Sequence, residues 1–309
     1  MTTMSSRVTI GITCYNASDT IARAVASALR QEWPDVEVVV VDDCSDDASW
    51  SVLCKIADAE ARLKVFRQST NQGYPSALNR ILAEASGEFV AIFDDDDDNI
   101  ADRLRAQVER ITTYERTCES SLILCYSNRA VVKSGHSAPD HVAEAIGRCA
   151  PEPHGTEVAD YILGVGARSG RVWGMFGSCT LMARKSTFDA IGPFDPKFRR
   201  CAEWDFAIRA SQIGAHFIAV DRPLITQYKT QSDDKSGTKP LFYSLMLRDK
   251  HRSYLEQKGM YQASRMLARS NFWGNKRRRF RSLMFRALAY MMAPQLIPGY
   301  LRRRFRATF

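Results

Sequence analysis

Residues 87–98 read GEFVAIFDDDDD, and this stretch predicts both a fold and a site. Its first seven residues are typical of a buried β-strand, which would deliver the five carboxylates to the carboxyl end of that strand. Adjacent carboxylates repel one another unless a cation neutralises them, and a hard divalent cation such as Mg²⁺ prefers oxygen ligands. A solvated acidic loop is the alternative for an isolated Asp run, so the neighbouring segments decide between the two.

The residues before this stretch alternate short apolar runs with helical patterns. The expected strands are 8–13, 36–41, 63–66 and 88–93, and the expected helices between them are 21–29, 52–59 and 77–85. This rhythm predicts an α/β fold with a mostly parallel sheet and helices on both of its faces. Ligands of such sheets bind beyond the carboxyl ends of the strands. Residues 13–16, residues 42–43 and the Asp run all fall there, so we interpret them as parts of one site.

The rest of the chain continues this pattern less regularly. An amphipathic helix is expected over 99–116 and a strand over 121–126. Residues 127–172 are rich in Gly, Pro and polar residues and predict a loop with one helix near 156–164. The pattern of residues 178–229 is again typical of α/β structure, and residues 240–293 are expected to be helical throughout.

Composition and missing motifs exclude several classes of protein. The chain has 309 residues, 45% of them apolar, which is enough for a sizeable core. Eight Cys without a CxxC pair and an N-terminus without a signal-peptide pattern predict reduced thiols and a cytoplasmic protein. No GxGxxG follows the first strand and no GxxxxGK[ST] occurs anywhere, which argues against a dinucleotide-binding fold and a P-loop ATPase.

Polar residues at the first two strand ends are candidates for contacts with a nucleobase. Thr13 could hydrogen-bond a base and Tyr15 could stack on it, although a turn with a packed tyrosine fits these residues equally well. Asp43 follows a run of four valines, and a carboxylate in that position can accept a hydrogen bond from a base N–H.

The order of these motifs resembles that of glycosyltransferase family 2. The resemblance covers roughly residues 7–230 and rests on residues 13–16 (TCYN), 26–31 (ASALRQ), 41–47 (VDDCSDD), 71–73 (NQG), 77–79 (ALN), 85–89 (ASGEF), 93–97 (FDDDD) and 102–104 (DRL). It implies a GT-A fold with a Rossmann-like sheet, a nucleotide-diphosphate sugar as the donor, and a divalent cation, Mn²⁺ or Mg²⁺, as the cofactor.

Carried over position by position, the resemblance implies a set of donor contacts and a metal ligand. Thr13, Tyr15 and Asp43 match the nucleobase contacts, and the other expected donor contacts are Asn16, Asn71, Gly73, Asn79, Asp94 and Asp95. The metal ligand falls on Asp96, counted back from residues 102–104, or on Asp97 if the register of the Asp run slips by one. An EF-hand is excluded, since the sixth residue from Asp94 is Asn99 rather than Gly.

Residues 192–209 resemble the family's Gly-Phe-Asp element and the acidic motif that holds its catalytic base. Glu203 falls at the position of the base, where Asp is usual in the family. Trp204, Asp205 and Ser178 are placed on the acceptor side, and Asp205 is also expected to orient a loop or a helix terminus. The alternative for Glu203 is a purely structural ion pair with a neighbouring arginine, Arg200 or Arg209.

These residues predict a metal-dependent, inverting glycosyltransferase. A cation can stabilise the charge of a departing nucleoside diphosphate, and one positioned carboxylate can take the proton of the acceptor hydroxyl. By resemblance, we expect a UDP-sugar donor and a glycan or lipid-linked acceptor in cell-envelope or capsule polysaccharide synthesis. The alternatives are a sugar nucleotidyltransferase, which needs a Gly-rich basic loop after the first strand, and a degenerate nucleotide-sugar-binding or membrane scaffold protein.

The C-terminal residues have a different composition from the rest of the chain. The net charge is +8, but no Asp or Glu follows Glu256, and residues 257–309 hold thirteen Lys or Arg. Apolar residues recur at helical spacing between Phe280 and Met291, next to four arginines at 277–281. This pattern predicts a basic amphipathic helix on an anionic membrane surface. Packing against the catalytic domain is the alternative, and no motif supports binding of nucleic acid.

We therefore predict two regions and a peripheral location. Residues 1–239 are expected to form the GT-A catalytic domain, with nucleotide-sugar binding in 7–126 and the acceptor and base part in 127–239. Residues 240–309 are expected to form a basic helical region. The protein is expected to be cytoplasmic and peripheral on the inner face of the plasma membrane.

Overall fold

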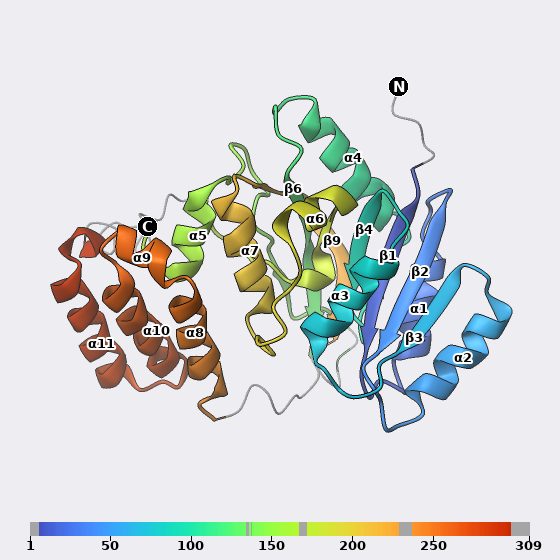
Figure 1. Ribbon diagram of the computed structural model, residues 1–309, viewed down its shortest axis with the longest axis horizontal. Helices are drawn as coiled ribbons and strands as arrows, with labels where there is room; N and C mark the ends of the chain where they lie inside the picture. Colours follow the sequence, from blue (N-terminus) through green and yellow to red (C-terminus); the bar gives the residue numbers. More distant parts are fainter. Residues whose placement is uncertain (1–5, 134–135, 137, 167–171, 229–236, 298–309) are drawn as a thin grey trace.

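The computed structural model describes residues 6–133, 136, 138–166, 172–228 and 237–297. Within these residues a nine-stranded sheet runs through the molecule and carries helices on both faces (Figure 1). The strands are β1 (Val8–Cys14), β2 (Val36–Asp42), β3 (Leu63–Arg67), β4 (Phe89–Phe93), β5 (Asp98–Asn99), β6 (Ile123–Val132), β7 (His141–Ala143), β8 (Met182–Arg184) and β9 (His216–Tyr228). The predicted α/β fold is confirmed.

The sheet topology explains why three strand ends meet at one edge. The strand order is β3-β2-β1-β4-β8-β6-β9-β5, with β7 beside β6. The first four strands are parallel, and so are β6 and β9, whereas β8 runs antiparallel to both of its neighbours and joins the two parallel blocks. Because β1 lies between β2 and β4, the residues that follow these three strands lie side by side.

The alternation of apolar side chains along the strands builds a core on each face of the sheet. Val38 and Val40 of β2 belong to a core with α1, α2 and α4, while Val39 and Val41 belong to the opposite core with α3, α5, α6 and α7. The helices are α1 (Ile21–Leu29), α2 (Ser49–Ala59), α3 (Tyr74–Glu84), α4 (Arg103–Glu115), α5 (Thr156–Leu163), α6 (Lys185–Ile191), α7 (Ala202–Gln212), α8 (Lys239–Lys250), α9 (Arg252–Gln257), α10 (Tyr261–Asn275) and α11 (Arg279–Met292).

Most of the expected elements before residue 164 agree with the structure to within three residues, but two differ by more. The helix expected from residue 99 begins at Arg103, because the residues before it pair with β9 as the short strand β5. The buried Arg103 side chain fixes this arrangement by donating hydrogen bonds to Asn99 and to the Ile92 carbonyl. The strand expected at 121–126 continues to Val132, because its second half pairs with β9 and with β7.

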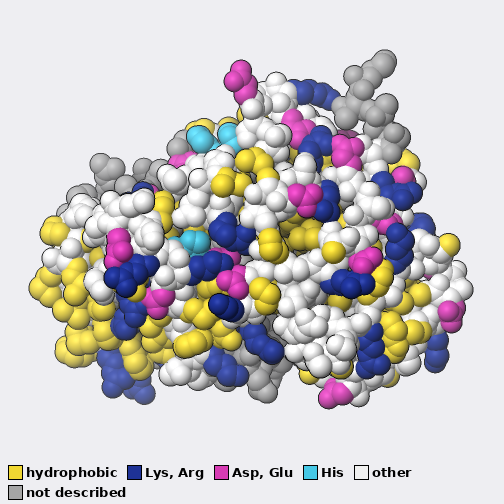
Figure 2. Space-filling view, in the orientation of Figure 1, with side chains coloured by type: hydrophobic (Ala, Val, Ile, Leu, Met, Phe, Trp, Pro, Cys, Tyr) yellow, Lys and Arg dark blue, Asp and Glu magenta, His cyan; other side chains and the backbone are white. Residues whose placement is uncertain are grey.

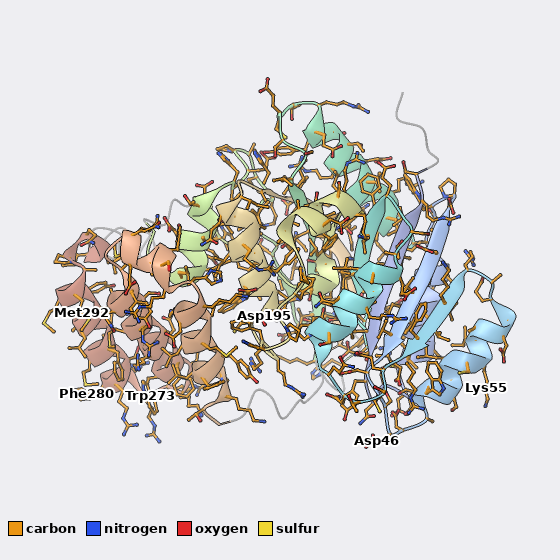
Figure 3. All side chains as sticks on the ribbon, viewed as in Figure 1. Asp46, Lys55, Asp195, Trp273, Phe280 and Met292 are labelled. Carbon is orange, nitrogen blue, oxygen red and sulfur yellow. The ribbon has the colours of Figure 1, made fainter. Side chains whose placement is uncertain are left out.

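The C-terminal helices α8–α11 lie at one end of the molecule (Figure 1). Leu247, Ala263 and Ala289 from these helices belong to the same apolar core as α5 and α7. The other side of α11 faces solvent: hydrophobic side chains gather over this end in Figure 2, and Figure 3 places Phe280 and Met292 there. Helix α11 is thus packed on one side and exposed on another, and the domain boundary at residue 239 stays a prediction.

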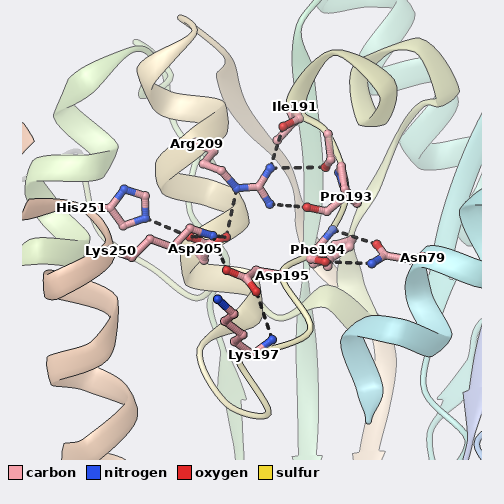
Figure 4. A network of polar contacts seen from close by, with 11 residues as sticks. Asn79, Ile191, Pro193, Phe194, Asp195, Lys197, Asp205, Arg209, Lys250 and His251 are labelled. Carbon is pink, nitrogen blue, oxygen red and sulfur yellow. Dashed lines mark hydrogen bonds and ion pairs between the residues drawn. The ribbon is translucent and has the colours of Figure 1, made fainter. Parts of the chain in front are cut away.

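Asp205 of α7 fastens the C-terminal helices to the rest of the fold (Figure 4). Its fully buried carboxylate lies 3.0 Å from Arg209 Nε, 2.9 Å from Lys250 Nζ and 3.0 Å from His251 Nε2. Burial by itself would raise the pKa of Asp205, but the hydrogen bonds from His251 and Lys250 and the charge of Arg209 outweigh it and lower this pKa to about 2.

We expect Asp205→Asn to lower the free energy of unfolding by about 2 kcal/mol at pH 7, since each unit of pKa shift is worth about 1.4 kcal/mol. A carboxyl with a lowered folded-state pKa stabilises the fold above its unfolded-state pKa near 4, and this contribution is lost as the pH falls toward 2. Urea unfolding of both proteins at pH 7, 5 and 3 measures the difference, which should shrink only in the most acidic series. A difference independent of pH would contradict this account.

Candidate active site

A cavity of about 1220 Å³ opens at the carboxyl ends of β1 and β4 and reaches α7, α8, α10 and α11. Most of the residues predicted for the site line it. On the donor side these are Thr13, Tyr15, Asp43, Asn71 and Gly73, followed by the acidic residues Asp94, Asp95 and Asp96. On the expected acceptor side they are Ser178, Glu203 and Trp204. The topology therefore brings together eleven of the fifteen predicted residues.

The four remaining predicted residues do not line this cavity. The Asn16 amide oxygen accepts the backbone N–H of Asp46, which ties the loops after β1 and β2 together. Asn79 exchanges two hydrogen bonds of 2.8 Å with the backbone of Phe194, and Asp205 forms the buried contacts already described. Asp97 lies inside the protein. Of the two roles expected for Asp205, its geometry supports the structural one and not a place on the acceptor side.

Asp43 organises the donor side of the cavity. One carboxylate oxygen accepts the Gln72 backbone N–H at 2.8 Å and the Gln68 amide at 2.7 Å, and the other accepts the Gly73 backbone N–H at 2.7 Å. Gly73 has a φ of +89°, a conformation that favours glycine. These three hydrogen bonds hold the loop at residues 68–73 in place. A carboxylate can accept about four hydrogen bonds, so Asp43 can accept one more from a ligand.

The acidic run divides between the cavity and the protein interior. Asp94, Asp95 and Asp96 line the cavity, and the Tyr15 backbone N–H donates to Asp95 Oδ2 at 3.1 Å. Asp97 is fully buried, and its two carboxylate oxygens have no hydrogen-bond partner among the described residues. Carboxylate oxygens of Asp94 and Asp97 and the Cys179 thiol lie within 4.8 Å of one another.

Burial and mutual repulsion make this cluster costly to ionise. Burial raises the pKa of Asp94 to about 7, with further contributions from Asp96 and Glu203. Burial also raises the pKa of Asp95 to about 7 and that of Asp97 to about 8. A divalent cation beside these carboxylates would favour their charged forms, so the oxygen-rich wall of the cavity fits a hard cation.

Glu203 stands in the first turn of α7, where the chain enters the helix through Cys201 with a φ of +65°. Its carboxylate accepts a hydrogen bond from Ser178 Oγ at 3.3 Å, and this hydroxyl lies 2.6 Å from the hydroxyl of Tyr74. Arg209, one of the two arginines suggested as a structural partner for Glu203, is instead bound to Asp205 and to the carbonyls of residues 191–193.

Five arginines that were not predicted as site residues also line the cavity: Arg129, Arg199, Arg200, Arg248 and Arg286. Arg199 Nη1 lies 3.4 Å from the side-chain oxygen of Asn71, one of the expected donor contacts, and Arg200 follows Arg199 in the chain. Arg129 Nη1 lies 3.3 Å from Cys179 Sγ and opposes the negative charges of Asp94 and Asp97. Arg199 and Arg200 follow shortly after the motif at 192–195, so the sequence could have suggested them. No sequence motif marks Arg129, because its place in the site depends on the pairing of β6.

Comparison with known proteins agrees with this geometry. The model of glycosyl transferase family 2 matches residues 9–186, which is more than half of the chain. The chain belongs to glycosyltransferase family 2. The resemblance noted in the sequence and the GT-A type of fold are thereby confirmed.

Individual relatives of this family 2 chain match parts of it. Succinoglycan biosynthesis protein ExoO of Rhizobium meliloti is 45% identical over 33% of the chain and 29% of its own length. The glucosyltransferase WfaP of Escherichia coli, named for UDP-Glc and α-D-GlcNAc-diphosphoundecaprenol, is 31% identical over 41% and 47%. The chain thus spans less than half the length of either relative.

A solved structure shares the fold along nearly the whole chain. The crystal structure of Staphylococcus aureus TarS 1–349 in complex with UDP-GlcNAc superposes with a TM-score of 0.60 at 18% identity, covering 98% of this chain and 92% of TarS 1–349. At this identity the likeness establishes the fold alone, and at 98% coverage of this chain the shared fold includes the C-terminal helices.

Proposed function

We propose that this family 2 chain transfers a sugar from a UDP-sugar to a hydroxyl group of a glycan or lipid-linked acceptor, with inversion, during synthesis of a cell-envelope or capsule polysaccharide. The observation that carries the proposal is one cavity shared by the expected donor contacts, the carboxylates of Asp94–Asp96 and Glu203. The names of WfaP and of the TarS complex support a UDP-sugar donor, the name of WfaP supports a lipid-linked acceptor, and the name of ExoO supports a polysaccharide pathway.

The donor would lie across the ends of β1, β2 and β4. Tyr15, which is half exposed at the cavity, would stack on the base, and Thr13 and Asp43 would bind its polar edge. Asp94 and Asp96 would hold a divalent cation, which when bound neutralises the charge of the leaving diphosphate. Arg199 offers a guanidinium beside Gly73, and arginine suits phosphate oxygens because it presents several donors in one plane.

Glu203 would act as the general base. Its carboxylate faces the same cavity as the acidic wall, and the hydrogen bond from Ser178 holds it in place. It would take the proton of the acceptor hydroxyl as this oxygen attacks the anomeric carbon and the bond from that carbon to the diphosphate breaks. The exposed Trp204 next to it offers an aromatic wall for a sugar ring. A single base without a covalent intermediate gives inversion.

The experiment that tests this function measures products from a panel of nucleotide sugars. Purified protein with Mn²⁺ is incubated with UDP-Glc, UDP-GlcNAc, a dTDP-sugar and a GDP-sugar, with and without a GlcNAc-diphosphate lipid as the acceptor. We expect release of UDP that the acceptor accelerates at least tenfold. Release of pyrophosphate would indicate a nucleotidyltransferase, and binding without turnover of any donor would indicate a scaffold protein.

We further propose that the basic C-terminal end of the molecule rests on an anionic membrane surface as a peripheral attachment at the inner face of the plasma membrane. No helix in the described ranges is long and apolar enough to span a bilayer. Lys276, Arg277, Arg278 and Arg279, which lead into α11, are all exposed. Each Lys or Arg near an anionic surface contributes about 1 kcal/mol at moderate salt.

Replacing residues 276–279 together by Gln should weaken binding to vesicles of phosphatidylglycerol and phosphatidylcholine at least tenfold in a sedimentation assay. The matched control removes the same charge elsewhere by replacing Lys55, Arg62, Lys64 and Arg116, and should change binding less than threefold. Equal losses in the two variants, or binding to purely zwitterionic vesicles, would contradict attachment through this end.

A further inference from the structure

The cavity does not end at Glu203. Beyond α7 it continues between α8, α10 and α11, where Leu241, Leu267, Asn275, Arg286 and Tyr290 line it. Its volume of about 1220 Å³ exceeds the usual range of ligand pockets, roughly 300–1,000 Å³. The donor contacts all lie at the sheet end, so the section between the C-terminal helices has room for a second ligand.

The two sections differ in charge. The sheet end carries the carboxylates of Asp94–Asp96 and Glu203, whereas no acidic residue occurs anywhere in the chain after Glu256. Arg286 of α11, Arg248 of α8 and amide side chains such as Asn275 give the outer section its polar character. The Arg248 guanidinium donates hydrogen bonds to the carbonyls of Ser264 and Ser244. A negatively charged group of an acceptor would be repelled at the acidic end but attracted at the outer end, where a guanidinium can bind phosphate oxygens.

Helix α11 connects this section with the exposed apolar surface. One face, with Ser282 and Ala289, is buried, and Ser282 hydrogen-bonds to Ser270 of α10. At about 100° per residue, Arg286 and Tyr290 lie on the next face, which lines the cavity.

The face beyond that one carries exposed apolar side chains. Phe280 is 81% exposed, Leu283 59% and Met291 69%. Leu283 is only a small rotation away from Tyr290 on the helix, and Figure 3 places Phe280 at the outer end of the molecule. An aliphatic chain leaving the cavity past Arg286 would therefore meet an apolar surface at once.

We propose that α8, α10 and α11 form the acceptor subsite, and that its ligand is a saccharide linked through a diphosphate to an aliphatic lipid. The sugar lies near Glu203 and Trp204, the diphosphate beside Arg286, and the lipid runs out along Leu283 and Phe280. The order of acidic centre, arginine and apolar surface matches the order of sugar, diphosphate and hydrocarbon in such a molecule. This inference deepens the proposed function and rests on it for the identity of the reaction.

A binding experiment tests the subsite without requiring turnover. Farnesyl diphosphate is the probe, and its affinity for the full chain is measured by calorimetry. We expect Arg286→Gln to weaken binding tenfold or more, and Arg286→Lys to recover part of the loss. Arg269→Gln is the matched control, since Arg269 is a half-buried arginine of α10 that does not line the cavity, and should change affinity less than twofold.

A kinetic experiment tests the path of the lipid. GlcNAc-diphosphate acceptors with an eleven-carbon chain and with a methyl group are compared with the donor that the panel identifies. We expect a preference of at least tenfold for the longer chain, expressed in acceptor KM. Leu283→Gln should reduce this preference, and the control Ile213→Gln, an exposed apolar residue outside the cavity, should not.

The two experiments separate this inference from the proposed function. Farnesyl diphosphate binding that depends on Arg286 supports the subsite even when no donor turns over. Equal affinity of wild type and Arg286→Gln for farnesyl diphosphate would overturn the subsite but leave the transferase activity standing. Turnover that depends neither on the length of the acceptor's lipid chain nor on Arg286 would do the same. Preference for a soluble oligosaccharide without a diphosphate would overturn it as well.

Discussion

The Glu203→Gln variant is expected to bind a UDP-sugar as well as wild type does and to transfer the sugar 10²- to 10⁴-fold more slowly. General base catalysis contributes about this factor, and an amide cannot take up the proton of the acceptor hydroxyl. The substitution keeps the size of the side chain and the possibility of accepting the hydrogen bond from Ser178. Donor affinity by calorimetry and single-turnover transfer rates measure the two quantities separately.

Two further variants sharpen this prediction. Glu203→Asp keeps the carboxylate but withdraws it by one methylene, so its rate should lie between those of wild type and Glu203→Gln. Glu84→Gln removes a carboxylate on α3 that pairs with Arg80 outside the cavity, and it should transfer at nearly the wild-type rate. Transfer by Glu203→Gln within tenfold of wild type would assign the base to another residue.

The Asp96→Asn variant is expected to lose the stabilisation that UDP and Mn²⁺ together give to wild type. A ligand at about 100 times its dissociation constant adds about 2.7 kcal/mol to the stability of the protein that binds it. We expect a clear rise in Tm for wild type with UDP and Mn²⁺, a much smaller rise with UDP alone, and none for Asp96→Asn. Thermal unfolding followed by fluorescence measures these shifts without any turnover.

The Asp run supplies its own control for this experiment. Asp98 is two residues further along, but its carboxylate pairs with Arg30 and does not line the cavity, so Asp98→Asn should retain the metal-dependent shift. Asp97→Asn distinguishes the two registers of the Asp run, in which the metal ligand is either Asp96 or Asp97. Loss of the metal-dependent shift in Asp97→Asn but not in Asp96→Asn would assign the ligand to Asp97, which lies in the interior cluster with Asp94 and Cys179. A rise in Tm with UDP that is equal with and without Mn²⁺ would contradict the proposal that a cation binds in the donor site.

Glu203 and Asp205 show what a local sequence motif can predict and what it cannot. Both fall within one predicted acidic motif, and both stand in the first turn of α7. Two residues along a helix turn a side chain by about 200°, so one carboxylate faces the cavity and the other faces α8. Which of them does so depends on the packing of α7 against Lys250 and His251, some 45 residues away.

Asn79 and Arg129 also show that sequence motifs do not determine which side chains line the cavity. Asn79 belongs to a motif that suggested donor binding, yet its amide is used by the backbone of Phe194, 115 residues further along the chain. Arg129 belongs to no motif, yet it lies against the acidic cluster because β6 pairs with β8 and β9. Long-range contacts of this kind leave no periodic pattern in the sequence.

The sequence alone determined the first four strands, the helices between them and the strand ends at which Thr13, Asp43 and the Asp run converge, because hydrophobic periodicity is a local property and parallel strands end at a common edge. It also determined the concentration of positive charge after Glu256. Only the tertiary structure decided which carboxylates face the cavity and that α10 and α11 extend it. Those facts depend on how helices pack against one another, and packing is settled by contacts between residues that lie far apart in the chain.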